Sequence, residues 1–145
     1  MKQLAPIFNK EKPPGIYRIS SRNRPDALLE AVADHGWQGF YINGAHIVDK
    51  ASFINQFASA LSFPDYHGKN WDAFEDCITD MAWLPAKGYV LVYDNIRQFA
   101  RGNSKDWQTA CSILRDAASY WEGKGKPMFT LFRRYWWTAW DIEKL

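Results

Sequence analysis

Carboxylate side chains gather in one segment of the chain, residues 65–80, where they could hold a metal ion or attract a basic partner. The segment contains five acids and one lysine, so its net charge is −4. The whole chain carries +2, which leaves +6 for the remainder. One local surface is therefore strongly acidic on an otherwise basic protein. The acids are Asp65, Asp72, Glu75, Asp76 and Asp80.

The acidic segment is predicted to contain a helix over residues 70–81. Asn70 is a good N-cap, and Asp72 in the first turn is favoured by the positive end of the helix dipole. Asp76 follows Asp72 by one turn, where like charges repel by about 0.2–0.5 kcal/mol. A helix selected only for stability would not carry this pair, so the pair indicates a binding role. A solvated helix face without a partner is the alternative at this point.

Aromatic residues and a glycine flank the acids. Tyr66 and Trp71 stand on either side of Gly68, which lets another backbone approach closely. Aromatic anchors beside charges, on an exposed loop and a helix start, are typical of protein-binding hot spots. His67 lies in the same loop and is expected at the rim of such a site rather than as a metal ligand. The pattern favours binding of another protein over catalysis.

The elements that would position this segment follow from hydrophobic periodicity. Strands that alternate with helices indicate an α/β fold with a small parallel sheet, and the continuous apolar run 89–93 belongs at its centre. Helical spacing of apolar residues predicts helices over residues 25–36, 52–61, 70–81 and 104–121. Short apolar runs predict strands over residues 15–20, 39–43, 89–93 and 128–132.

The chain has the length of one ordinary domain, and we expect a single domain over residues 15–145. Residues 1–14 lack a clear period and end in two prolines, so they are expected to form a flexible arm. Residues 15–38 would add a strand and a helix, and residues 133–145 form a tail with three tryptophans. No apolar run approaches the roughly 20 residues of a membrane helix, so we expect a cytoplasmic protein.

The run from Pro64 to Ile78 resembles the signature of barstar, a family of intracellular inhibitors of the ribonuclease barnase. The resemblance covers roughly residues 39–132 and includes the run Tyr41-Ile42-Asn43-Gly44 near its start. It implies three parallel strands in that region, to which residues 15–38 would add a fourth. The residues that carry the signature are Tyr66, Gly68, Asn70, Asp72, Ala73, Asp76 and Cys77.

The resemblance also implies roles for individual residues. Asp76 would be the central acid, which mimics an RNA phosphate among the cations of a ribonuclease active site, and Asp72 would be a second acid. Tyr66 would pack against a histidine of that active site. Gly68 and Asn70 would supply adjoining contacts.

Further contacts and several departures complete the expected site. Asp116 and its apolar neighbour Ile113 would extend the contact from another helix. Glu75 and Met81 stand where the family inhibitor has tryptophans, and Trp71 replaces a leucine at the contact surface. Asp116 is also shorter than the expected glutamate. Trp71 and Glu75 are still expected to touch the partner, but the departures leave the identity of that partner open.

The resemblance implies a protein inhibitor that binds and blocks a small basic ribonuclease, works without a cofactor and is a monomer when free. A binding or immunity protein for a different basic toxin is one alternative. A metal-dependent hydrolase built on Asp72, Asp76 and Asp116 is another. The histidines are scattered and no HxxxH or CxxC spacing occurs, so we expect no enzyme.

Direct nucleic-acid binding is a further alternative, because basic and aromatic residues occur together near both ends of the chain. The excess of positive charge is modest, and the acidic segment would repel phosphate, so we expect no direct binding of nucleic acid. The residues that suggest it are Arg18, Arg22, Arg24, Arg133, Arg134, Trp136, Trp137 and Trp140.

Overall fold

The computed structural model describes residues 1–64, 70–135 and 141–145. Across these residues, four parallel strands form one sheet in the order β1-β4-β3-β2. The expected α/β class with a small parallel sheet is therefore confirmed. The strands are β1 (Gly15–Arg18), β2 (Gln38–Asn43), β3 (Tyr89–Asp94) and β4 (Met128–Arg133).

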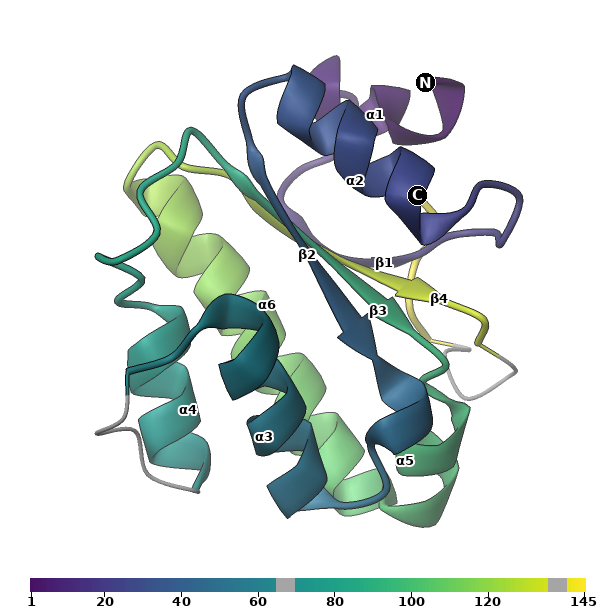
Figure 1. The fold of residues 1–145 in the computed structure, drawn as a ribbon, viewed down its shortest axis with the longest axis vertical. Helices are drawn as coiled ribbons and strands as arrows, with labels where there is room; N and C mark the ends of the chain where they lie inside the picture. Colours follow the sequence, from purple (N-terminus) through teal and green to yellow (C-terminus); the bar gives the residue numbers. More distant parts are fainter. Residues whose placement is uncertain (65–69, 136–140) are drawn as a thin grey trace.

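Helices cover both faces of the sheet (Figure 1). One face lies under α1 and α2, and the other under α3, α4 and α6. The first pair comprises α1 (Ala5–Phe8) and α2 (Pro25–Asp34). The second group comprises α3 (Lys50–Leu61), α4 (Trp71–Ile78) and α6 (Ser104–Gly123). The remaining short elements are η1 (Lys2–Leu4), η2 (Gly44–His46) and α5 (Arg97–Gly102).

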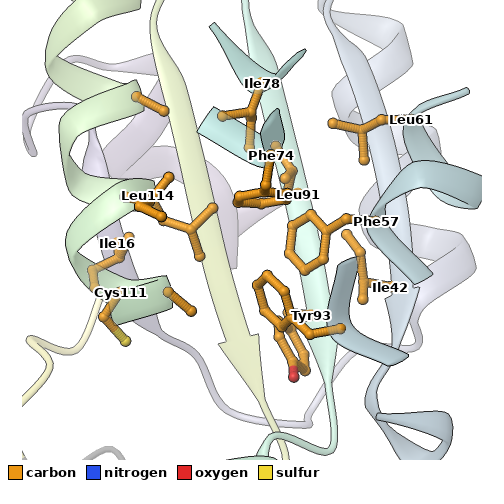
Figure 2. Close-up of a cluster of buried hydrophobic side chains, with 14 of the residues drawn as sticks. Ile16, Ile42, Phe57, Leu61, Phe74, Ile78, Leu91, Tyr93, Cys111 and Leu114 are labelled. Atoms are coloured by element: carbon orange, nitrogen blue, oxygen red, sulfur yellow. The ribbon is translucent and has the colours of Figure 1, made fainter. Parts of the chain in front are cut away.

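The two central strands, β3 and β4, are buried along their whole length. The continuous apolar run of β3 predicted this position, because a central parallel strand has no solvent face. Alternate side chains of β3 serve different layers: Leu91 and Tyr93 pack below α3 and α6, whereas Val90 and Val92 pack below α2. Figure 2 shows Leu91 and Tyr93 beside Phe57, among the buried side chains on the α3 and α6 side of the sheet.

The strand that residues 15–38 add lies at the edge of the sheet. β1 pairs with β4, and helix α2 then carries the chain across to β2 at the opposite edge. The free side of β1 meets the end of the chain: the Arg18 N–H donates to the Glu143 carbonyl at 2.9 Å, and the Leu145 N–H donates to the Arg18 carbonyl at 3.0 Å. The tail thereby covers this edge, and Ile142 is buried in the core.

The N-terminal segment differs from the flexible arm expected for residues 1–14. Leu4 and Ile7 are buried against the α2 side of the sheet. Phe8 stacks on His35 with ring centroids 3.7 Å apart and meets the edge of Trp37 at 5.0 Å. Helices of three and four residues leave too short a period to detect in a sequence, which is why the expectation was wrong.

The end of α4 and the helix α5 also differ from the sequence prediction. α4 ends at Ile78, three residues before the expected end, and Met81 has a left-handed backbone (φ 47°). The short helix α5 was not expected, because six residues give little periodic signal. In the part of the chain that the structure describes, no helix is long and apolar enough to cross a lipid bilayer.

Candidate functional site

Helix α4 starts with the cap that the sequence predicts. The Asn70 side-chain oxygen accepts a hydrogen bond from the Ala73 N–H at 2.8 Å. This bond satisfies one of the unpaired N–H groups in the first turn of α4. Asp72 lies in that turn, where the helix dipole favours its negative charge. The start of the acidic helix is therefore well defined by local interactions.

The inner face of α4 anchors the helix to the core. Phe74 is fully buried and meets Phe53 and Phe57 of α3 edge to face, both at 5.3 Å between ring centroids. Ile78 is also fully buried, and its carbonyl accepts a hydrogen bond from the Trp121 indole N–H of α6 at 2.9 Å. Figure 2 shows Phe74 and Ile78 pointing into the core. α4 is thus held between α3 and α6.

The outer face of α4 exposes carboxylates that no described cation neutralises. Asp72, Glu75 and Asp76 are exposed, and Asp80 follows just beyond the helix. The ion pairs between described residues form elsewhere, around Glu143, Asp26 and Asp94. A helix with a buried apolar face and an outer face of unneutralised acids is suited to receive a basic partner.

The cysteine of α4 is not poised for nucleophilic chemistry. Burial raises the pKa of the Cys77 thiol, and the charges of Asp76 and Asp80 raise it further. Burial also raises the pKa of Cys111 to about 12. Both cysteines are free and buried. Because the thiolate is the reactive form, both residues behave as core side chains at neutral pH.

Trp71 is half-buried and lies on the inner side of α4. Its ring meets Phe53 at 5.4 Å and Phe74 at 6.0 Å, in both cases edge to face. The indole N–H donates to the Asp106 carboxylate of α6 at 3.4 Å. A signal for this orientation exists in the sequence, since Trp71, Phe74 and Ile78 follow the i, i+3, i+7 spacing of one helix face.

The other predicted site residues fall into three groups. Asp116 is exposed on α6, the helix against which α4 packs. Ile113 is only 7% exposed and belongs mainly to the core. The structure therefore brings Asp116, but little of Ile113, to the surface. The three remaining residues, Tyr66, His67 and Gly68, lie outside the described residues.

A metal centre finds no support in the described residues. None of their His, Cys, Asp and Glu side chains form a group of three or more that could hold a metal ion. Asp72, Asp76 and Asp116 are among these side chains.

A second charged site, at the carboxyl end of the sheet, was missed by the sequence analysis. The Arg133 guanidinium donates to the Asp94 carboxylate at 3.0 Å, with both side chains almost fully buried. The Tyr41 hydroxyl donates to the same carboxylate oxygen at 3.0 Å. Burial, followed by the hydrogen bond to Asp94, raises the pKa of the Tyr41 hydroxyl, so this group stays a donor at neutral pH. The sequence does contain a signal for this buried pair, since Asp94 and Arg133 each stand at the end of an apolar strand.

Arg133 also binds the loop between β1 and α2. Its guanidinium donates to the carbonyl oxygens of Ser21, at 3.3 Å, and Asn23, at 3.1 Å. Arg18, another of the basic residues that suggested nucleic-acid binding, donates to the Ile142 carbonyl at 2.8 Å and to the Tyr135 hydroxyl at 3.3 Å. These two arginines are committed to internal contacts, so they form no open basic surface.

The comparisons with known proteins agree with this architecture. A family model described as "Barstar (barnase inhibitor)" matches residues 37–133, which is more than half of the chain. No curated protein sequence matches the chain.

Two solved structures of the ORC2 protein of Aeropyrum pernix share the fold. The structure of its ADPNP-ADP complexes superposes with a TM-score of 0.64 at 11% identity, covering 97% of this chain and 40% of that one. The structure of its ADP form gives a TM-score of 0.61 at 12% identity, covering 91% and 38%. The chain thus spans about two fifths of the length of those proteins. At this level of identity the likeness concerns the fold alone.

Proposed function

Because the chain belongs to the barstar family, we propose that it inhibits a small basic ribonuclease by plugging the enzyme's active site with residues 65–70 and helix α4. The observation that carries the proposal is the outer face of α4, which exposes Asp72, Glu75 and Asp76 without an ion pair to any described residue. A ribonuclease active site collects cationic side chains around the RNA phosphate. Carboxylates at fixed positions can replace that phosphate through charge-assisted hydrogen bonds.

Asp76 is proposed as the central phosphate mimic, with Asp72 as the second acid. Asp72 is the nearer of the two to the capped start of α4, and Asp76 lies one turn further along the exposed side. The helix therefore presents two carboxylates in line, a spacing that suits two neighbouring cations. Glu75 would lie at the rim and add a third negative charge.

The residues before α4 complete the proposed contact. We assign Tyr66 to aromatic packing on an active-site histidine of the partner, and Gly68 with Asn70 to backbone-level contacts. His67 is assigned to the rim. On α6, Asp116 would reach a further cation of the partner. The inhibitor would act as a cytoplasmic monomer without a cofactor, and it would have no hydrolase activity of its own.

A basic toxin of another kind is the alternative partner for the same surface. Glu75 supports a different basic toxin as partner, since it places an acid where the family inhibitor has a tryptophan. The surface of this chain is therefore more acidic there and less aromatic. A partner with more cations around its active site would complement this surface better than a partner with an apolar surface there.

Nucleotide binding, which the ADPNP-ADP complexes and the ADP form of ORC2 suggest, is not part of the proposal. A phosphate loop needs glycines that expose backbone N–H groups to the phosphates. Residues 19–24, which follow β1, contain no glycine. Carbonyl oxygens of this loop face the Arg133 guanidinium instead. The carboxyl end of the sheet is filled by the chain's own charges.

The test is titration of the protein against barnase, with calorimetry for affinity and cleavage of a fluorescent RNA for inhibition. We expect wild type to bind and inhibit, and Asp76→Ala to lose about 2 to 5 kcal/mol of binding free energy, because the partner's cations would stay desolvated and unpaired. Glu30→Ala, which removes an exposed acid from α2 on the other face, is the matched control and should bind normally.

Two results would count against the proposal. Normal binding by Asp76→Ala would remove α4 from the interface. Absence of binding by wild type would remove barnase as the target, and the same titration would then be repeated with basic ribonucleases and toxins captured from the source cells by wild type but not by Asp76→Ala.

A further inference from the structure

The first residue of α4, Trp71, links three helices through one side chain. Its ring packs edge to face on Phe53 of α3, and its indole N–H donates to Asp106 of α6. The same ring also meets Phe74 of α4 itself. Trp71 stands one residue before Asp72, the first of the acids proposed to bind the partner. The contact therefore lies directly beneath the start of the acidic face.

Asp106 is well placed to receive the indole N–H. It lies in the first turn of α6, where the dipole of a long helix favours a negative charge. It is half-buried, and it forms no ion pair with any described residue. Its carboxylate is a stronger acceptor than a neutral group would be, which compensates in part for the 3.4 Å length of the bond.

A short acidic helix needs such contacts. α4 has eight residues, fewer than a helix requires to be stable by itself in water. Its exposed acids repel one another in addition. A hydrogen bond from an indole N–H holds each end of α4 against α6. Trp121 of α6 donates to the Ile78 carbonyl at the C-terminal end, and Trp71 donates to Asp106 of α6 at the N-terminal end.

We propose that Trp71 and Asp106 are a positioning pair that sets where the first turn of α4 lies on α3 and α6, and so fixes Asp72 and Asp76 for the partner. This assignment rests on the proposed function of α4. It replaces the expectation that Trp71 touches the partner, because two phenylalanines and a carboxylate already engage the indole. A surface that is fixed before binding loses less conformational entropy on association.

A double-mutant cycle against catalytically inactive barnase tests the pair. Trp71→Phe removes the N–H and keeps an aromatic ring, whereas Asp106→Ala removes the acceptor. We expect each to raise Kd about tenfold, the typical effect of losing a hydrogen bond to a charged group, and the double variant to be no worse than either single one. Trp37→Phe, a half-buried tryptophan on the α2 side, is the matched control and should leave Kd unchanged.

Separate rates distinguish positioning from charge. Asp106→Asn keeps an oxygen acceptor and removes the charge, so we expect it to recover part of the slow dissociation that Asp106→Ala loses, with only a modestly slower association. If Trp71→Phe weakens binding while Asp106→Ala does not, Trp71 is a direct contact and the proposal is wrong. Additive effects of the two variants would overturn it as well.

A measurement without a partner keeps the proposal testable should wild type fail to bind barnase. The indole proton of Trp71 should shift in an NMR spectrum when Asp106 becomes Asn, while the indole proton of Trp37 should not. Amide exchange at Ala73 and Phe74 should speed up in Asp106→Ala and return toward the wild-type rate in Asp106→Asn. An unshifted Trp71 indole proton or unchanged exchange would overturn the positioning role whatever the partner is.

Discussion

Acidic side chains serve opposite purposes at two places in this molecule. On the outer face of α4, Asp72 and Asp76 are exposed and pair with no described cation. At the carboxyl end of β3, Asp94 is buried and pairs with Arg133, with Tyr41 donating a further hydrogen bond. Arg134 approaches the second oxygen of Asp94 at 3.4 Å.

The difference follows from the solvent around each acid. A buried carboxylate without a partner is costly, so folding itself demands the partners of Asp94. An exposed carboxylate is solvated by water, so folding demands nothing of Asp72 or Asp76. The repulsion between Asp72 and Asp76 slightly opposes folding, so the fold gives no reason for this pair. The buried site of Asp94 stabilises the fold, whereas the acids of α4 are available to a partner, as the proposed function requires.

Removing Arg133 should give the largest effect on stability. Arg133→Ala leaves the buried Asp94 carboxylate without its closest cation and frees the carbonyl oxygens of Ser21 and Asn23. We expect the free energy of unfolding to fall by about 3 to 5 kcal/mol, measured by urea denaturation. Arg134→Ala is the control, since that side chain is 54% exposed and should cost far less. Equal losses in the two variants would contradict the distinction between buried and exposed charge.

Salt should act on the α4 surface through the rate of association. Exposed acids attract a basic partner over a Debye length of about 8 Å at physiological ionic strength. We expect the association rate to fall by roughly tenfold between low and high salt, and the dissociation rate to change little, in stopped-flow experiments. The Asp72→Asn, Asp76→Asn double variant should show a shallower dependence. An association rate that does not change with salt would mean that another surface makes the first contact with the partner.

An exposed acid that folding does use lies at the start of α3, and it sharpens the comparison. The Ser52 N–H and hydroxyl donate to the Asp49 carboxylate, at 2.8 and 2.7 Å, which holds the pKa of Asp49 below its ordinary value of 3.8. A lowered pKa in the folded state means that Asp49 stabilises the protein above pH 3.8 and loses this effect as the pH falls through the lowered value.

The advantage of wild type over Asp49→Ala in urea denaturation should therefore shrink in acid. Asp49→Asn, which caps the helix but cannot titrate, should show no such trend relative to Asp49→Ala. A constant difference between wild type and Asp49→Ala across the acid range would mean that the carboxylate contributes nothing as a charge.

The smallest expected change is in the stability of the Asp76→Asn variant. Removing one of two like charges a turn apart should raise the free energy of unfolding by about 0.2–0.5 kcal/mol, measured by thermal melting at low salt. The gain should vanish at high salt, where the repulsion is screened. A substantial loss of stability would show that Asp76 supports the fold, and would bring it into the same class as Asp94.

The predictable parts of the structure were those with a long period or a strong cap. The spacing of apolar residues revealed α2, α3 and α6, the run of β3 placed it at the centre, and Asn70 marked the start of α4. Helix α5 and the two N-terminal helices were not predicted, because they are too short to show a hydrophobic period.

The contacts between distant residues could not be predicted in the same way. The pairing of Asp94 with Arg133 depends on the register of two neighbouring parallel strands, which a single sequence does not define. The contact of Trp71 with Asp106 depends on how α4 lies against α6. The acids of the candidate site were visible from type and spacing, whereas their supports arise only when the helices pack.

Both ends of the chain lie on the side of the sheet that carries α1 and α2, and α4 lies on the other side (Figure 1). The C-terminal residues also lie against the N-terminal part of the chain, since Lys12 pairs with Glu143 and the Leu145 N–H donates to the Arg18 carbonyl. A fluorescent protein or a surface tether joined at either end would therefore leave the acidic face unobstructed. Two copies joined through these ends would each keep an acidic face that the linkage does not cover. Such a tandem could hold one basic partner on each copy, and it would bind a partner that is itself joined in pairs more tightly than a single copy does, provided that the linker spans both sites.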